Sequence, residues 1–208
     1  MKKNMFGILS DDLSDNKFLD SLTGDNVQEI SYVAKEYIIH LDDQIENVAD
    51  YRKALHILRV ASENDVIRII LSSYGGSVDI ALQMYNLLLQ TKAQTIAEVY
   101  IAYSAASIIM LACDQIQLQK YCSVMCHNLS WGSSGKVNEI TAHAGFMKNW
   151  SNDLCKNIYE GFLTEKELQD MSEGKDYWMT YDQVYKRLKN WKSIRQRIYE
   201  KYINKNGK

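Results

Sequence analysis

The 208-residue sequence lacks proline, has only four cysteines and contains no long apolar run. An average composition would supply roughly ten prolines, so no turn of this chain is stiffened by a pyrrolidine ring. The cysteines are too sparse for a disulfide scaffold, and we expect reduced, mostly buried thiols. Cys122 and Cys126 have no matching second pair, which argues against a metal site.

Without an apolar run of about 18 residues, we expect no membrane-spanning segment. The N-terminus leads into a polar, Asp-rich stretch and not into an apolar signal core. These two absences predict a soluble protein of the cytoplasm.

Charge is distributed unevenly, although the formal net charge is only -2. Residues 186–208 hold nine basic residues against one acid, Glu200. The first thirty residues are Asp-rich and show no sustained period of 2 or 3.6, as is typical of a loosely ordered extension. We therefore predict an acidic extension over residues 1–35, one folded domain over 36–188 and a basic amphipathic helix over 189–208. That helix would pack on its own domain or, alternatively, dock on an acidic partner.

Apolar runs separated by turn residues predict alternating strands and helices. The expected strands cover residues 37–41, 66–71, 95–102, 115–118 and 122–126. Expected helices cover residues 78–91, about 104–112 and 137–162, and capping boxes at Thr164 and Thr180 open two more short helices. This alternation favours an α/β fold with parallel strands and right-handed crossovers.

Three residues in the order serine, histidine, aspartate suggest nucleophilic catalysis. Ser107 lies near the start of a predicted helix, whose N-terminus would stabilise developing negative charge. His127 ends a predicted strand, where alternation places it on the face opposite Cys126. Asp176 lies between the two capping boxes. A serine hydroxyl becomes a nucleophile when an imidazole takes its proton and a carboxylate orients that imidazole.

Other residues near these positions have structural explanations as well. Ser77 and Ser104 compete with Ser107, and each precedes a predicted helix that it could simply cap. Gly75 and Gly76 form a turn whose N–H groups would face an oxyanion, or else a plain strand-to-helix turn. No Gly-Lys-Ser or Gly-Lys-Thr follows, so a phosphate-binding loop is excluded.

Together, four fragments resemble the proteolytic subunit of the Clp protease, ClpP, and especially ClpP-like proteases encoded by bacteriophages. The resemblance extends from about residue 36 to about residue 188. The family's Ser-Pro-Gly-Gly-Ser-Val turn appears as Ser-Tyr-Gly-Gly-Ser-Val at residues 73–78. Its Met-Ala-Ala-Ser-Met-Gly, Met-Ile-His-Gln and Arg-Asp-x-Phe-Met-Ser segments correspond to residues 104–109, 125–128 and 175–180.

The resemblance implies a ClpP/crotonase-like spiral of repeated ββα units with a protruding helical handle over residues 137–162. It implies a serine endopeptidase that cleaves polypeptides inside a homo-oligomeric ring, a heptamer or double heptamer, served by an AAA+ unfoldase. A phage-encoded member would act in the host cytoplasm. No cofactor, metal, nucleic acid or membrane partner is implied.

The resemblance also assigns roles within the site. It makes Ser107 the nucleophile, His127 the general base and Asp176 the residue that holds the imidazole. The oxyanion would be received by N–H groups of the Gly75 and Gly76 turn and of Ile108.

Three departures from the family pattern affect this site. Tyr74 stands in place of the proline, which makes the loop less rigid, and Tyr103 and Ile109 replace glycines on either side of the nucleophile, which crowds it. Two other classes of function stay open: a catalytically silent ClpP-like structural subunit and a crotonase-type acyl-CoA enzyme with a similar oxyanion turn. A Ser-Lys dyad peptidase has no supporting membrane segment.

Overall fold

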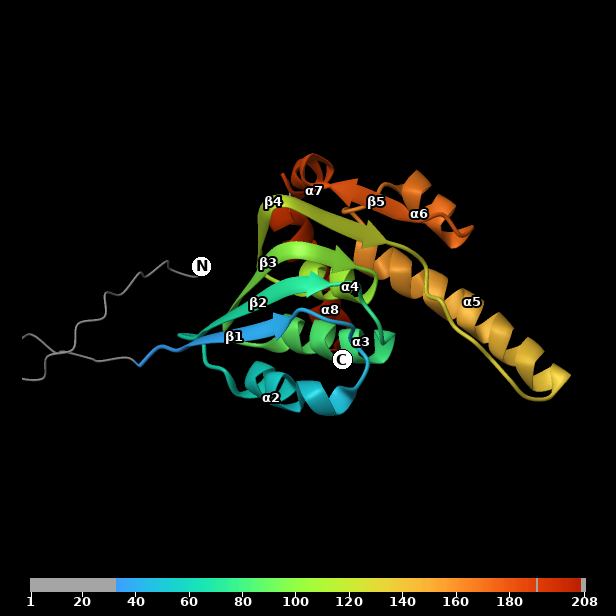
Figure 1. The fold of residues 1–208 in the computed structure, drawn as a ribbon, viewed down its shortest axis with the longest axis horizontal. Helices are drawn as coiled ribbons and strands as arrows, with labels where there is room; N and C mark the ends of the chain where they lie inside the picture. The colour runs from blue at the N-terminus through green and yellow to red at the C-terminus, as the bar shows by residue number, and fades with distance from the viewer. Residues whose placement is uncertain (1–32, 190, 207–208) are drawn as a thin grey trace, which may run out of the picture. The chain divides into compact units, whose positions relative to one another are not determined.

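The computed structural model describes residues 33–189 and 191–206. Most of the predicted N-terminal extension lies outside the described residues. One compact unit begins at Ala34 and contains the helices and strands of Figure 1. None of the helices in the described part of the chain is long and apolar enough to cross a membrane.

A single five-stranded sheet organises this unit, with its strands in chain order. Four strands run parallel and a fifth runs antiparallel along β4: β1 (Glu36–Leu41), β2 (Val66–Ser73), β3 (Gln94–Tyr103), β4 (Gln115–Cys126) and β5 (Tyr177–Thr180). Parallel neighbours require crossover connections, which are usually helical. The expected α/β class with a parallel core is therefore confirmed.

Helices provide those crossovers. The first crossover contains the 3-10 helix η1 (Val48–Tyr51) and α2 (Arg52–Val60), and the next two contain α3 (Val78–Gln90) and α4 (Ala105–Ala112). Figure 1 shows α2 and α3 on the same side of the sheet. All eight residues of α4 are buried, which fits the small and apolar composition of this segment.

The two strands predicted over residues 115–118 and 122–126 form one continuous strand, β4. Its pairing with β3 shifts between the partners of Val99 and Ile101, which are Leu118 and Ser123. The extra residues of β4 form a bulge, in which Tyr121 has a positive φ of 66°. Because the bulge interrupts the alternation of side chains, the sequence pattern predicts two short strands where the structure has one continuous strand.

The C-terminal part of the chain is mostly helical, with α5 (Val137–Tyr159), α6 (Glu165–Ser172), α7 (Tyr181–Leu188) and α8 (Trp191–Asn206). Figure 1 shows α5 extending past the sheet, as expected of a protruding handle. Both predicted capping boxes are present, one joining Thr164 to Glu167 and the other joining Thr180 to Gln183.

Helix α8 packs against its own domain through Trp191, Ile194 and Arg195, all of which are buried. The Arg195 guanidinium donates hydrogen bonds to the carbonyl oxygens of Ala112 (2.7 Å) and Cys113 (3.3 Å). These carbonyls lie at the C-terminal end of α4, where a helix leaves acceptors without intrahelical donors. Packing on the same domain, the first of the two alternatives for this helix, is thus observed for these residues.

Candidate active site

The candidate site lies where the carboxyl ends of β3 and β4 meet the start of β5. Ser104 follows β3 directly, and its N–H donates to the Met125 carbonyl oxygen at 2.9 Å. His127 follows β4, and the antiparallel pairing of Cys126 with Tyr177 brings Asp176 opposite His127. Three residues far apart in the chain therefore meet because of strand register.

A hydrogen bond joins His127 to Ser104. The distance from His127 Nε2 to Ser104 Oγ is 2.7 Å. On the other side of the ring, His127 Nδ1 lies 4.0 Å from Asp176 Oδ1, which is too long for a hydrogen bond but close enough for an electrostatic contact with a protonated imidazole. The arrangement is serine, histidine and aspartate in a row, with Ser104 as the serine.

Ser107, the predicted nucleophile, is not part of this row. It is fully buried, and its Oγ lies 2.7 Å from the Ser104 carbonyl oxygen and 2.7 Å from the Tyr159 hydroxyl. Cys126 Sγ approaches Ser107 Oγ at 3.8 Å. Since Cys126 and His127 are successive residues at a strand end, their side chains point to opposite sides. His127 therefore contacts Ser104, whereas Ser107, the predicted nucleophile, lies on the Cys126 side.

The backbone of Ser104 is unusual and leaves its hydroxyl available. Its φ is 52° and its ψ is -121°, a region that residues other than glycine rarely adopt. Its side chain does not cap α4, whereas the Ser77 hydroxyl does cap α3 by accepting from the Ile80 N–H. The capping interpretation thus holds for Ser77 and not for Ser104.

The glycine turn packs directly against Ser104. Gly75 has a φ of 95°, and a Cβ at this position would lie 2.7 Å from Ser104 Cβ and 3.0 Å from the Ala105 nitrogen. Only glycine combines this backbone conformation with such a close approach. The turn therefore lies beside the first N–H of α4, that of Ala105.

The predicted oxyanion donors have different surroundings. The Gly75 N–H points at Ser73 Oγ, 3.1 Å away. Ile108 lies one turn inside α4, where N–H groups bond to the carbonyl four residues earlier. Ala105 is the first residue of α4, and a helix leaves its first N–H groups without an intrahelical acceptor. The Ala105 N–H, which the sequence analysis does not single out because it places the nucleophile at Ser107, is therefore freer to receive an oxyanion than the Ile108 N–H.

The residues before and after Asp176, Lys175 and Tyr177, are both held by polar contacts with α6. Asp170 of α6 accepts from the Tyr177 hydroxyl at 3.0 Å and from Lys175 Nζ at 3.3 Å. Further along, Glu167 and Arg187 join α6 to α7 by two hydrogen bonds of 2.6 and 2.9 Å. These bonds lower the pKa of Glu167 to about 2. No spacing in the sequence signals these pairs.

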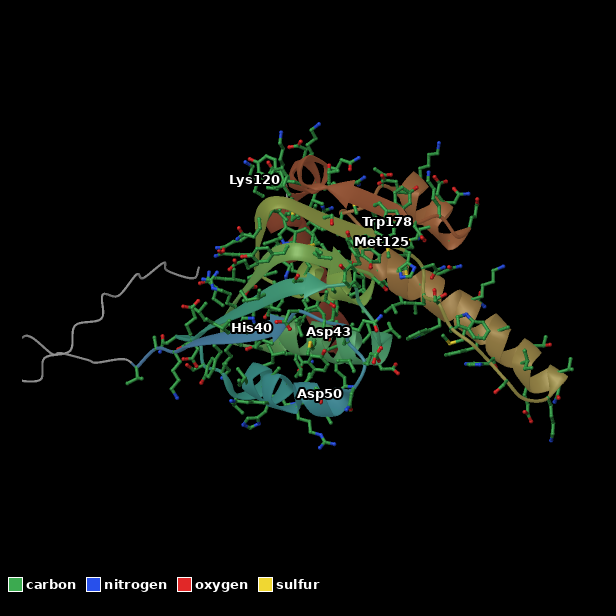
Figure 2. The ribbon with its side chains drawn as sticks, viewed as in Figure 1. His40, Asp43, Asp50, Lys120, Met125 and Trp178 are labelled. Atoms are coloured by element: carbon green, nitrogen blue, oxygen red, sulfur yellow. The ribbon has the colours of Figure 1, made fainter. Side chains whose placement is uncertain are left out.

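Three aromatic rings lie together near the site, those of Tyr74, Tyr103 and Trp178, and the side chains of Tyr74 and Trp178 are more than half exposed. The Tyr103 ring lies 5.7 Å from that of Tyr74 and 5.0 Å from that of Trp178. Figure 2 shows Trp178 close to Met125, its partner in the pairing of β4 with β5. The Tyr103 hydroxyl is held by Ser123 Oγ at 2.6 Å. The expected crowding by Tyr103 is thus limited, because its hydroxyl is anchored on β4.

A cavity of about 420 Å³ adjoins the site through Asn128, the residue after His127. Its lining comes from α5 and α6 as well, including Asp153, Lys156 and Glu165. The Asn128 side chain donates to Asn152 Oδ1 at 2.9 Å, which links the strand end to α5. Neither Ser104 nor His127 lines this cavity, so Asn128 is its link to the strand end that carries the site.

A family model described as Clp protease matches residues 23–186, a range that includes Ser104, His127 and Asp176. A search of curated proteins found no match.

Proposed function

The chain belongs to the Clp protease family, and from this premise we propose that it is a serine-type endopeptidase whose nucleophile is Ser104. Membership in the family implies a peptidase, and the mixed α/β fold is consistent with a ClpP-like fold. The observation that carries the proposal is the 2.7 Å contact between Ser104 Oγ and His127 Nε2. A general base has to lie within hydrogen-bond reach of the proton it takes.

The proposed reaction begins when Ser104 Oγ attacks the carbonyl carbon of a peptide bond. His127 takes the serine proton at Nε2 and then delivers it to the leaving nitrogen, so that the C–N bond breaks and an acyl-serine forms. Water, deprotonated by the same imidazole, then hydrolyses the ester and regenerates Ser104. Asp176 faces Nδ1 and stabilises the imidazolium that forms in each half of the reaction.

The oxyanion would be received at the N-terminus of α4. We assign the Ala105 N–H as one donor, because it is the residue after the nucleophile and has no intrahelical acceptor. The glycine turn, predicted to supply the second donor, lies against Ser104, and we keep Gly76 for that role since Gly75 points its N–H at Ser73. The positive end of the α4 dipole favours the same charge.

Family membership suggests polypeptide substrates and oligomeric assembly. We propose a homo-oligomeric ring in which α5 contributes contacts between subunits. The exposed side chains of Val137 and Phe146 on this helix support that role, since large apolar side chains exposed on one element often mark an interface. The AAA+ unfoldase and the phage origin stay predictions from the resemblance.

Labelling with a fluorophosphonate probe tests the proposal. Purified protein is treated with the probe while the mass of its assembly is recorded on the same sample. We expect covalent labelling of the unmodified protein, none of Ser104→Ala, and a drop of about 100-fold or more for His127→Ala. Ser107→Ala is the matched comparison, because it removes the same hydroxyl three residues away; it should still be labelled to completion, at whatever rate, since the proposed nucleophile is intact.

Two outcomes would contradict this assignment in different ways. Labelling that survives Ser104→Ala but disappears in Ser107→Ala would return the nucleophile to Ser107. A correctly assembled protein that is not labelled at all would support a catalytically silent subunit of the same fold.

A further inference from the structure

A small polar cluster lies buried beneath Ser104. It consists of Ser107 on α4, Tyr159 at the last position of α5 and Cys126 at the end of β4. Ser107 and Cys126 are fully buried, and the exposed fraction of Tyr159 is 1%. No step of the proposed reaction uses these side chains. The Ser107 hydroxyl nevertheless bonds to the Ser104 carbonyl oxygen, and the Tyr159 hydroxyl bonds to that of Ser107.

The direction of each hydrogen bond follows from the number of protons available. The Ser104 carbonyl oxygen can only accept, so the Ser107 hydroxyl donates its single proton to it at 2.7 Å. Ser107 Oγ must therefore accept in its contact with Tyr159, and the Tyr159 hydroxyl is the donor at 2.7 Å. Burial raises the pKa of Tyr159 well above its ordinary value, so this donor keeps its proton at any working pH.

The chain of bonds ends on the peptide group that follows the nucleophile. Besides the Ser107 hydroxyl, the Ser104 carbonyl accepts the Ser107 N–H at 2.9 Å. These contacts hold the carbonyl while Ser104 adopts its φ of 52°. A residue in a rarely populated backbone region keeps that conformation only when its surroundings restrain it. The same peptide group carries the Ala105 N–H that the proposed mechanism uses for the oxyanion.

We propose that Tyr159 and Ser107 are positioning residues that hold Ser104 and the Ala105 N–H in their reactive orientation. The inference rests on the proposed function, since it assigns a role relative to Ser104 as nucleophile. Tyr159 acts through Ser107, and Ser107 acts through the Ser104 carbonyl. Neither side chain touches the substrate.

Tyr159→Phe tests the proposal most directly, because it keeps the ring and removes only the donor hydroxyl. We expect the rate of fluorophosphonate labelling and the kcat for a short peptide to fall about tenfold, with KM unchanged. The pH dependence of labelling should keep its midpoint, because the His127 contacts are untouched. Tyr37→Phe, at the opposite end of the sheet near the start of β1, is the matched control and should label like the unmodified protein.

A second pair of variants distinguishes the proposed positioning role from a general loss of folded protein. Ser107→Ala should slow labelling by a similar factor, and the double variant Ser107→Ala with Tyr159→Phe should be no slower than Ser107→Ala alone, because both changes break one chain of bonds. Equal labelling rates for Tyr159→Phe and the unmodified protein would overturn the proposal, even if thermal stability fell. So would fully additive effects in the double variant. If the unmodified protein is labelled and Ser104→Ala is not, either result leaves the proposed function standing.

Discussion

At the scale of single residues, the site depends on the contact between Gly75 and Ser104. Gly75 has no side chain, so Ser104 can pack closely against it while its hydroxyl contacts His127. Gly75 and Gly174 have similar positive φ angles, 95° and 103°. A Cβ at Gly174 would meet no atom within 4 Å, whereas one at Gly75 would overlap Ser104 Cβ and the Tyr103 carbonyl. Substituting each of these two glycines therefore distinguishes the cost of the left-handed backbone, which both share, from the cost of a steric overlap, which applies only to Gly75.

We predict that Gly75→Ala destabilises the protein more than Gly174→Ala does. Both variants should lose about 1–2 kcal/mol of unfolding free energy from the left-handed backbone, and Gly75→Ala should lose about 1–3 kcal/mol more from the overlap. Denaturant unfolding of the two variants measures the difference. Equal losses would mean that the turn can move away from Ser104, which would remove the structural reason for glycine at position 75.

The choice between Ser104 and Ser107 could not be made from the sequence alone. Both serines flank the same two alanines, and the resemblance to the family fragment assigns the nucleophile to Ser107. The observation that favours Ser104 is the contact of its hydroxyl with His127, which depends on the parallel pairing of β3 with β4. His127 and the alternation that separates it from Cys126 could be predicted, since they depend only on local strand geometry.

At the scale of elements, α6 and α7 hold β5 and the Asp176 loop in place through Glu167 and Arg187. The two side chains are about four-fifths buried and form two hydrogen bonds. Charge-assisted, paired hydrogen bonds of this kind are stronger than neutral ones. Because the pKa of Glu167 is lowered from 4.5 to about 2, its contribution to stability is complete above pH 4.5 and is lost as the pH falls toward 2.

We predict that Glu167→Gln lowers the unfolding free energy by about 2 kcal/mol at neutral pH. The loss should shrink between pH 4.5 and 2, since the unmodified protein gives up the same contribution there. Thermal unfolding across this range measures the effect. Glu36→Gln, whose carboxylate is half exposed in its pair with Arg68, should change stability by less than about 1 kcal/mol. Parallel curves for Glu167→Gln and the unmodified protein would disprove the claim.

The four parallel strands can be predicted from the sequence because their apolar runs are long, whereas β5 cannot be recognised in this way. Its four residues are too short for a period of 2 to be recognised, and pairing with β4 is what makes them a strand. The same pairing brings Asp176 to His127, so the position of Asp176 came from the resemblance and not from local pattern. The helix predicted to residue 162 ends at Tyr159, shortly before Gly161 with its φ of 85°.

At the scale of the whole molecule, the four cysteines are free and buried, as the composition predicted. They lie on separate parts of the unit, at the end of α4, on β4 and on α5: Cys113, Cys122, Cys126 and Cys155. Burial raises the pKa of each thiol, to about 12 for Cys126 and about 11 for Cys155. Since the thiolate is the reactive form, all four should be inert in the folded protein.

We predict that a disulfide reagent such as dithionitrobenzoate modifies none of the cysteines of the folded protein within minutes at pH 8. All four should react at once in denaturant, and a thiol at an exposed loop position, Ser134→Cys, should react quickly without it. Absorbance of the released thiolate gives the count. Rapid reaction of a native cysteine would show that the core opens locally far more often than the described packing allows.

The place of β5 at the outer edge of the sheet has a consequence for biosynthesis. A ribosome releases the chain from its N-terminus, so Ser104 and His127 emerge well before the segment that pairs with β4. Until that segment docks, nothing brings Asp176 to the imidazole. Under the proposed mechanism, the nascent chain would therefore lack peptidase activity through most of its own synthesis and would not cleave other nascent chains nearby.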